Sequence, residues 1–476
     1  MISWGGINWY EDMINRFVHH LALRLFDHPL RSLSVAWVFC FSVFCGLQVI
    51  FLSTGNLINH YPFMGPDSYD WYVEGIYLVQ LLQGESLPNL FVLRPPVFVL
   101  VCALDYFLGA SGYVVGIVLG LCIFGTFTLC LALVETVQKF TAINAATPEP
   151  LPRTMLQVKQ CNEDWAAPIL AIVLTIVPIN FFTPFVYADR LASFLSLLSV
   201  YLLICWHEKK VGSIPLWAIF AAVMAGLTQV YAVIPFGVAL AFIAGMRFYN
   251  VNGRRFQALL QPVISVLILI CLIAGLSYVW RSTIAHGFTP PYLSLIAFDG
   301  QMLRFYKHTW GFYVLPIALM VMLLGRPALV LLRSSSVLQI ALGISITLMG
   351  LLLLYHWEEA RFTYYFFPWW MIFLCTFFSA RNSLSIGIIV TFLLVYSALV
   401  PQNYWIPQPR TLELNLRQSW IGDFALAGPV DRGLDKCEAN SNCLANNLFI
   451  AGSEGYTQTM MGIYLQLMEI QRKQEK

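Results

Sequence analysis

Three carboxylates fall within one short stretch, residues 67–74 (DSYDWYVE), directly after the first long apolar segment. Asp67 and Asp70 are three positions apart, so on a helix they share a face. Such a carboxylate can accept the proton of an attacking hydroxyl as a general base, or bind a divalent metal ion through oxygen. Pro66 followed by Asp67 is also typical of a helix start. We expect at least one of the two aspartates, Asp67 before Asp70, to take part in chemistry.

Arginines follow these carboxylates later in the chain. Arg94 precedes two prolines at the start of an apolar segment, where their missing N–H groups cost little. Its planar guanidinium suits a phosphate clamp, and snorkelling to the membrane interface is the alternative. Asp189 and Arg190 form an acid–cation pair between two apolar segments. This pair either contributes to a site or caps the next helix and neutralises itself.

The stretch 356–361 (HWEEAR) brings a histidine, two acids and an arginine to the end of an apolar segment. Arg361 can stabilise a leaving phosphate there, with His356 and Glu359 beside it. A charge-paired helix end is the alternative interpretation.

The composition indicates a membrane protein. The chain is 59% hydrophobic and 11% charged, whereas soluble domains carry about 25% charged residues. The net charge of +2 is uninformative about partners, and no basic block suggests a nucleic-acid partner. A spanning helix needs about 20 apolar residues. The apolar segments are 33–52, 92–108, 113–134, 166–186, 191–206, 216–231, 233–248, 262–280, 310–332, 337–355, 365–378 and 386–400.

Lysine and arginine in the short loops predict the orientation of these segments. If the N-terminus is cytoplasmic, most of these lysines and arginines lie on the cytoplasmic side. This assignment requires residues 92–134 to cross an odd number of times, although they contain two apolar segments. We therefore expect one of the two to be re-entrant or packed against the bundle without spanning. The outer loops then hold Arg94, Arg190, Arg281, Arg304, Lys307 and Arg361, together with the carboxylates described above.

The sequence therefore predicts an all-α, polytopic membrane helix bundle of about 11–12 apolar helices. An interfacial helix is expected in the first external loop, with Tyr69, Trp71 and Tyr72 as anchors at headgroup depth. Residues 1–400 would form the membrane-embedded domain, and residues 401–476 a small extracytoplasmic segment.

Together these motifs resemble the integral-membrane GT-C glycosyltransferases, nearest to the branch of protein mannosyltransferases and aminoarabinose transferases. Gln229 departs from the pattern, because a basic residue is often expected near the middle helices. The resemblance rests on DSYDW (67–71), RPPVF (94–98), YADRL (187–191) and EARF (359–362) with Pro368 after it.

The resemblance implies an inverting transferase that moves a sugar from a polyprenyl-phosphate donor to an acceptor hydroxyl. Asp67 or Asp70 would act as the base and Asp189 would assist. Arg94 and Arg361 would hold the phosphate. No cofactor is obligatory, and the carboxylates are compatible with a divalent metal ion. The further residues expected to contact the substrate are Arg190, Glu359, His356 and Arg304.

The same resemblance implies an acceptor that is a lipid, a glycan or a protein of the cell envelope. The active site would lie on the extracytoplasmic face of a bacterial inner membrane, and no nucleic acid would be involved.

Two other classes of function remain open. A polysaccharide polymerase or ligase that uses lipid-diphosphate glycans would rely on a large arginine-rich external loop, for which the insert 281–309 offers Arg281, Arg304 and Lys307. A transporter would need ionisable residues at mid-membrane depth, whereas the charges here collect at helix ends. The sequence contains no Walker A loop, so a nucleotide-dependent mechanism is unsupported.

Overall fold

The computed structural model describes residues 29–53, 66–84, 94–109, 112–145, 166–176, 188–208, 214–250, 255–284, 332, 335–353, 365 and 367–379. Their regular elements are the helices α2 (Pro29–Ser53), α3 (Pro66–Leu82), α4 (Pro96–Phe107), α5 (Tyr113–Ala145), α7 (Ala166–Ile176), α8 (Asp189–Glu208), α9 (Leu216–Gly226), the 3-10 turn η4 (Val230–Val233), α10 (Ile234–Asn250), α11 (Arg255–Ile284), α13 (Ser336–Leu353) and α14 (Phe367–Ser379). The expected all-α bundle is confirmed for this part of the chain. The expected segments 310–332 and 386–400 lie almost wholly outside it, as does all of 401–476.

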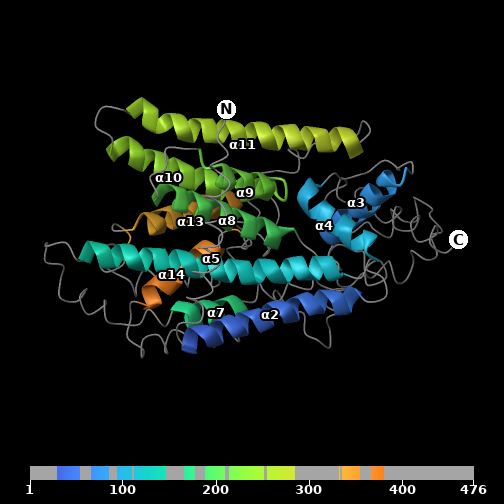
Figure 1. Cartoon of the computed structure of the whole chain (residues 1–476), viewed down its shortest axis with the longest axis horizontal. Helices are drawn as coiled ribbons and strands as arrows, with labels where there is room; N and C mark the ends of the chain where they lie inside the picture. Colours follow the sequence, from blue (N-terminus) through green and yellow to red (C-terminus); the bar gives the residue numbers. More distant parts are fainter. Residues whose placement is uncertain are drawn as a thin grey trace, which may run out of the picture.

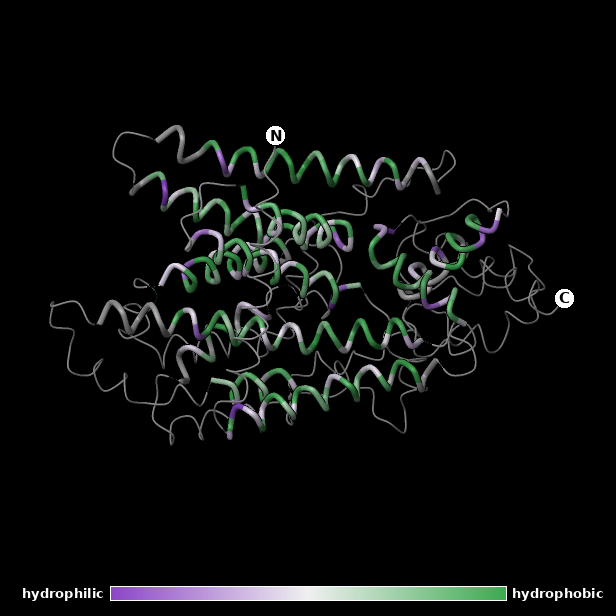
Figure 2. Tube along the Cα trace, in the orientation of Figure 1, coloured by the Kyte–Doolittle hydropathy of each residue, from purple (hydrophilic) through white to green (hydrophobic). Residues whose placement is uncertain are grey.

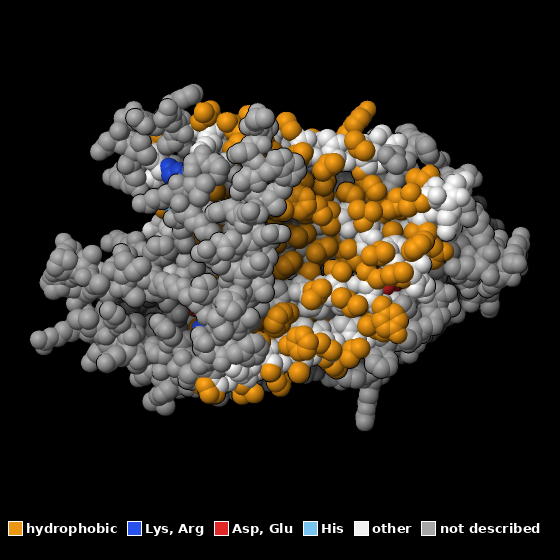
Figure 3. Space-filling view, in the orientation of Figure 1, with side chains coloured by type: hydrophobic (Ala, Val, Ile, Leu, Met, Phe, Trp, Pro, Cys, Tyr) orange, Lys and Arg blue, Asp and Glu red, His pale blue; other side chains and the backbone are white. Residues whose placement is uncertain are grey.

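Five of the described helices are long and apolar enough to cross a membrane. Figure 2 shows that hydrophobic residues dominate them, and Figure 3 shows apolar side chains over much of the described surface. Such a surface suits contact with lipid, because it would be costly in water. The five stretches are Pro29–Leu47, Tyr113–Val137, Asp189–His207, Val230–Phe248 and Leu260–Trp280.

Small residues let α2 and α5 pack closely and antiparallel. A Cβ atom on Gly116 would lie 2.6 Å from the carbonyl oxygen of Gly46, and one on Gly120 would lie 2.9 Å from that of Ser42. Both helices therefore present small residues four positions apart at the contact, the spacing that allows close approach in membranes. This contact fixes two long helices side by side (Figure 1).

Helix α4 is too short to span a bilayer by itself. Its 12 residues rise about 18 Å, against a hydrocarbon core of about 30 Å. It packs on α3 so closely that a Cβ atom on Gly75 would lie 2.7 Å from the backbone nitrogen of Ala103. Among residues 92–134, α5 is therefore the helix that is long and apolar enough to cross a membrane, while α4 is not.

The chain turns from α4 into α5 around one buried carboxylate. The Asp105 side chain accepts the backbone N–H of Gly112 at 2.9 Å and that of Val114 at 2.8 Å. These donors stand at the start of α5, where backbone N–H groups have no partner within the helix. Asp105 therefore has a structural role and holds the last turn of α4 next to the first turn of α5.

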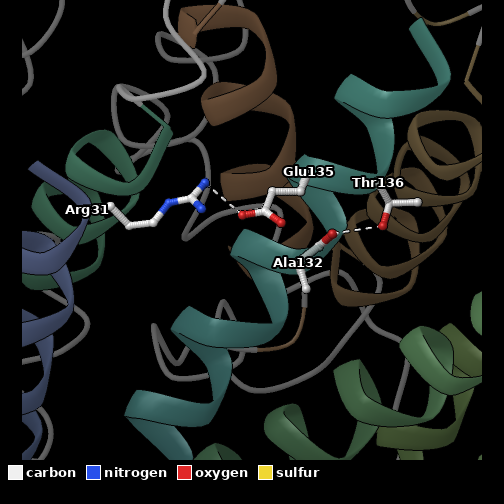
Figure 4. A network of polar contacts seen from close by, with 4 residues as sticks. All are labelled: Arg31, Ala132, Glu135 and Thr136. Atoms are coloured by element: carbon white, nitrogen blue, oxygen red, sulfur yellow. Dashed lines mark hydrogen bonds and ion pairs between the residues drawn. The ribbon is translucent and has the colours of Figure 1, made fainter. Parts of the chain in front are cut away.

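Two helices extend beyond the apolar segments expected from the sequence. The chain stays helical after the expected segment 113–134, since α5 continues to Ala145. Glu135 is accommodated because Arg31 of α2 lies 2.8 Å away (Figure 4). Helix α11 begins at Arg255, before the expected apolar segment 262–280, and runs through Pro262, and its candidate membrane span is Leu260–Trp280. Helices in membranes tolerate such prolines where neighbouring groups compensate.

The bundle has two distinct ends (Figure 1). Helices α3 and α4 lie at the first, which we call the α3 end, together with the first turns of α5 and α8 and the last turns of α11. The opposite end, which we call the Arg31 end, holds the first turn of α2, the last turns of α8 and α10, and the first turns of α11. The long helices connect the two ends.

Candidate functional site

Helix α3 provides one side of the candidate site. The backbone of Asp67 and Asp70 lies in its first turns, as the sequence predicts, while the side chains of both residues lie outside the described atoms. Helical spacing places positions 67, 70 and 74 on one side of α3. The contacts of Glu74 therefore show which part of the chain that side meets.

Glu74 ties α3 to the segment that leads into α4. Its carboxylate is 2% exposed, and its two oxygens accept the backbone N–H of Arg94 at 2.7 and 2.9 Å. On the other side of the same residue, Trp280 Nε1 of α11 donates to the Arg94 carbonyl oxygen at 3.0 Å. Both backbone groups of Arg94 are thus bound, which fixes its position between α3 and α11.

The Arg94 guanidinium lies against an aromatic ring. Its Cζ atom is 5.6 Å from the ring centroid of Trp71, within cation–π range. Trp71 itself is 1% exposed and packs edge-on against Phe98, with centroids 5.5 Å apart. The expectation that Trp71 anchors the helix in the interface is therefore wrong, because its surroundings are protein. Arg94 is half-buried and keeps part of its surface accessible.

Asp189 is the first residue of α8 and is buried, with 1% exposure. The hydroxyl of Tyr365 donates to its Oδ1 at 2.6 Å, a short distance that is typical of a hydrogen bond to a carboxylate. An acid at this position also interacts favourably with the helix dipole. Asp189 therefore starts its helix and at the same time makes a buried contact with a distant part of the chain.

Arg190 is likewise buried, with 9% exposure. It lies on α8, which packs against α5. Membrane proteins place such cations toward the bundle interior and seldom toward lipid. Together, Asp189 and Arg190 place one acidic and one cationic side chain inside the α3 end of the bundle.

The connection between α9 and α10 contacts both halves of the site. The backbone N–H of Val97, just after the two prolines, donates to the Leu227 carbonyl oxygen at 3.1 Å. Four residues on, Tyr231 packs edge-on against Tyr365, with centroids 5.6 Å apart. Gln229 between them is buried. The start of α4 and the Asp189–Tyr365 pair are therefore neighbours at one end of the bundle.

Four of the expected substrate-contacting residues cannot be placed. His356, Glu359, Arg361 and Arg304 lie outside the described residues. Arg94, Asp189 and Arg190 are described, and all three lie at the same end of the bundle as the start of α3. Among the described residues, no group of three or more His, Cys, Asp or Glu side chains could hold a metal ion.

The residues that sequence reasoning missed are those that position the others. Glu74 was visible as the third carboxylate of its stretch, but its partner, the backbone N–H of Arg94, gives no sequence signal. Tyr365, Tyr231 and Trp280 read as ordinary aromatics of apolar segments. No protein-family model, curated protein or solved structure matches this chain.

Proposed function

We propose that this protein is a glycosyltransferase that moves a sugar from a polyprenyl-phosphate donor to an acceptor hydroxyl at the α3 end, on the extracytoplasmic side. The observation that carries the proposal is the buried Asp189, held at 2.6 Å by Tyr365 beside the buried Arg190. This pair shares its end of the bundle with the half-buried Arg94 and the first turns of α3. Transfer of a sugar from a lipid phosphate requires an acidic side chain to accept a proton and cationic side chains to bind the phosphate.

The chemistry follows from these residue types. Asp67 or Asp70 accepts the proton of the acceptor hydroxyl while that oxygen attacks the anomeric carbon, which inverts its configuration. The bond from the anomeric carbon to the phosphate oxygen breaks, and the lipid phosphate leaves with the electron pair. Arg94 and Arg361 stabilise the phosphate as its negative charge develops. The buried Asp189 orients the acceptor and favours positive charge at the sugar carbon.

The position of the site suits a donor with a lipid tail. Helix α4 carries exposed apolar side chains at Leu100, Leu104 and Phe107, directly beyond Arg94. A polyprenyl chain can lie against this surface while its phosphate reaches the arginine. The stretch 356–361 precedes Tyr365 by only a few residues, so the covalent chain keeps Arg361 within about 14 Å of Tyr365. We propose that Arg361 reaches the same site, because Tyr365 contacts Asp189.

A transfer assay tests the proposal. The purified protein is given a panel of polyprenyl-phosphate sugars, with polyprenyl-diphosphate glycans as a second panel, and transfer to added acceptors is measured. We expect transfer from the first panel, and a loss of about 10²-fold or more in the Asp67→Asn or Asp70→Asn variant, as for removal of a general base. Glu135→Gln is the matched control, because this carboxylate pairs with Arg31 at the opposite end.

The outcomes separate the interpretations. If both aspartate variants keep full transfer, the assignment of the base is wrong. If wild-type protein neither binds nor uses a lipid-monophosphate sugar, the proposed function is wrong. Use of diphosphate-linked glycans alone would instead identify a polymerase or ligase.

A further inference from the structure

One cation at the Arg31 end is held by two neighbouring helices. Arg247 is in the last turn of α10, and its Cζ atom lies 4.0 Å from the ring centroid of Trp206 on α8. Its Nε donates to His207 Nδ1 at 3.4 Å, and a terminal nitrogen donates to Gln261 Oε1 of α11 at 3.0 Å. The ring and the two acceptors together fix the plane of the guanidinium.

The Arg247 guanidinium is held in place, but none of its partners among the described side chains is a carboxylate. Its contacts there are an aromatic ring and neutral acceptors. Neither α10 nor α11 contains an Asp or Glu. At the same end of the bundle, Arg31 has Glu135 at 2.8 Å. The two arginines therefore differ: Arg31 forms an ion pair, whereas Arg247 contacts neutral groups.

The adjoining sequence adds positive charge to this place. Two lysines (209–210) follow the last residue of α8, and two arginines (254–255) stand where α11 begins, with Glu208 as the acid among them. In sequence, these basic residues directly adjoin the ends of α8 and α11 that the contacts of Arg247 join. Basic clusters beside spanning helices attract anionic lipid headgroups.

An apolar surface starts next to this cluster and runs along the bundle. Gln261, which binds Arg247, is followed on α11 by exposed Val263, Leu267 and Ile270. Only 11% of the span Leu260–Trp280 is buried inside the structure. This arrangement is complementary to a phospholipid. The headgroup can bind the cation at the end of α11, and the acyl chains can lie along its exposed apolar face.

We propose that the ends of α8, α10 and α11 bind an anionic phospholipid. Its phosphate is bound by the Arg247 guanidinium, and its acyl chains lie along the exposed face of α11. The site is at the opposite end of the bundle from Asp189 and does not depend on the proposed transferase activity.

Lipid binding by the full-length protein tests this proposal. The delipidated protein in neutral detergent is titrated with phosphatidylglycerol or with phosphatidylcholine of the same acyl chains, and bound lipids are counted by native mass spectrometry. We expect wild type to prefer phosphatidylglycerol, and Arg247→Gln to reduce that preference about fivefold, the effect of one basic residue near the membrane surface. Arg247→Lys keeps the charge without the planar stacking and is expected to fall between the two.

Arg31→Gln is the matched control, because it removes an arginine from the same end and is expected to leave the preference unchanged. Equal binding of the two lipids by wild type would overturn the proposal, as would an unchanged preference in Arg247→Gln. Displacement of phosphatidylglycerol by an equal concentration of inorganic phosphate would show that the acyl chains add no affinity and would also overturn it. If Arg247→Gln is not monodisperse, the wild-type preference for phosphatidylglycerol and its reduction in Arg247→Lys decide.

Discussion

At the α3 end, Glu74 and Asp189 are buried carboxylates that accept hydrogen bonds from a backbone N–H and from a tyrosine hydroxyl. At the Arg31 end, the carboxylate of Glu135 pairs directly with Arg31. A direct ion pair cancels charge and serves to join helices. Under the proposed function, the acids at the α3 end act on a ligand, whereas we expect the Arg31–Glu135 pair to be structural.

The largest effect is expected from Asp189→Asn. The amide keeps the size of the side chain and can still accept the Tyr365 hydroxyl, but it removes the negative charge. We expect transfer to fall about 100-fold, within the range that a positioned carboxylate contributes. Glu135→Gln makes the same chemical change at the other end and should leave the rate within about twofold. Equal losses in both variants would show that the two ends do not differ in function.

Tyr365→Phe is expected to have the next largest effect. It removes the donor to the buried Asp189 and should lower the free energy of unfolding by about 2 kcal/mol, as for hydrogen bonds to charged groups. A denaturant titration in mixed micelles measures the change. Tyr278→Phe is the control, because Tyr278 is 74% exposed on α11. A Tyr365→Phe variant as stable as this control would mean that the hydroxyl contributes nothing.

The contact between α2 and α5, which connects the two ends, should be sensitive to one methyl group. Gly116→Ala places a Cβ atom 2.6 Å from a carbonyl oxygen and forces the helices apart. We expect a loss of at least about 1 kcal/mol in the free energy of unfolding. Gly245→Ala meets no atom within 4 Å and should be neutral, or more stable by up to about 1 kcal/mol. The opposite ranking would rule out this helix contact.

The smallest effect is expected at the Arg31–Glu135 pair. A double-mutant cycle with Arg31→Gln and Glu135→Gln isolates the coupling energy between the two side chains. We expect about 1 kcal/mol or less, since the side chains are only 13% and 17% exposed and the cost of desolvating both charges offsets much of their attraction. A much larger coupling, accompanied by lost transfer, would contradict the view that this pair is only structural.

The helices could largely be predicted from the sequence, because hydrophobicity and length are local properties. The stretch after Pro66 is helical as expected, and helix α4 begins directly after Arg94-Pro95. The continuation of α5 beyond the apolar segment 113–134 could not be predicted, because it depends on Arg31, far away in sequence, which pairs with Glu135 in the helix.

The partners within the candidate site could not be predicted in the same way. Tyr365 and Asp189 are 176 positions apart, and Trp280 and Arg94 are 186 apart. Neither pair leaves a periodic signal, because a single hydrogen bond depends on how whole helices pack. What the sequence did indicate is which loops share an end, since alternating spans place Arg94 and Asp189 on the same side.

Photo-crosslinking of a donor tests the central claim most directly. A polyprenyl-phosphate sugar that carries a diazirine on the sugar is bound to the wild-type protein, irradiated, and mapped by peptide mass spectrometry. The proposed function predicts labels in the first turns of α3, around Arg94 and around Asp189, all removed by excess unlabelled donor. Labels confined to the Arg31 end, or labels that the unlabelled donor does not compete away, would contradict it.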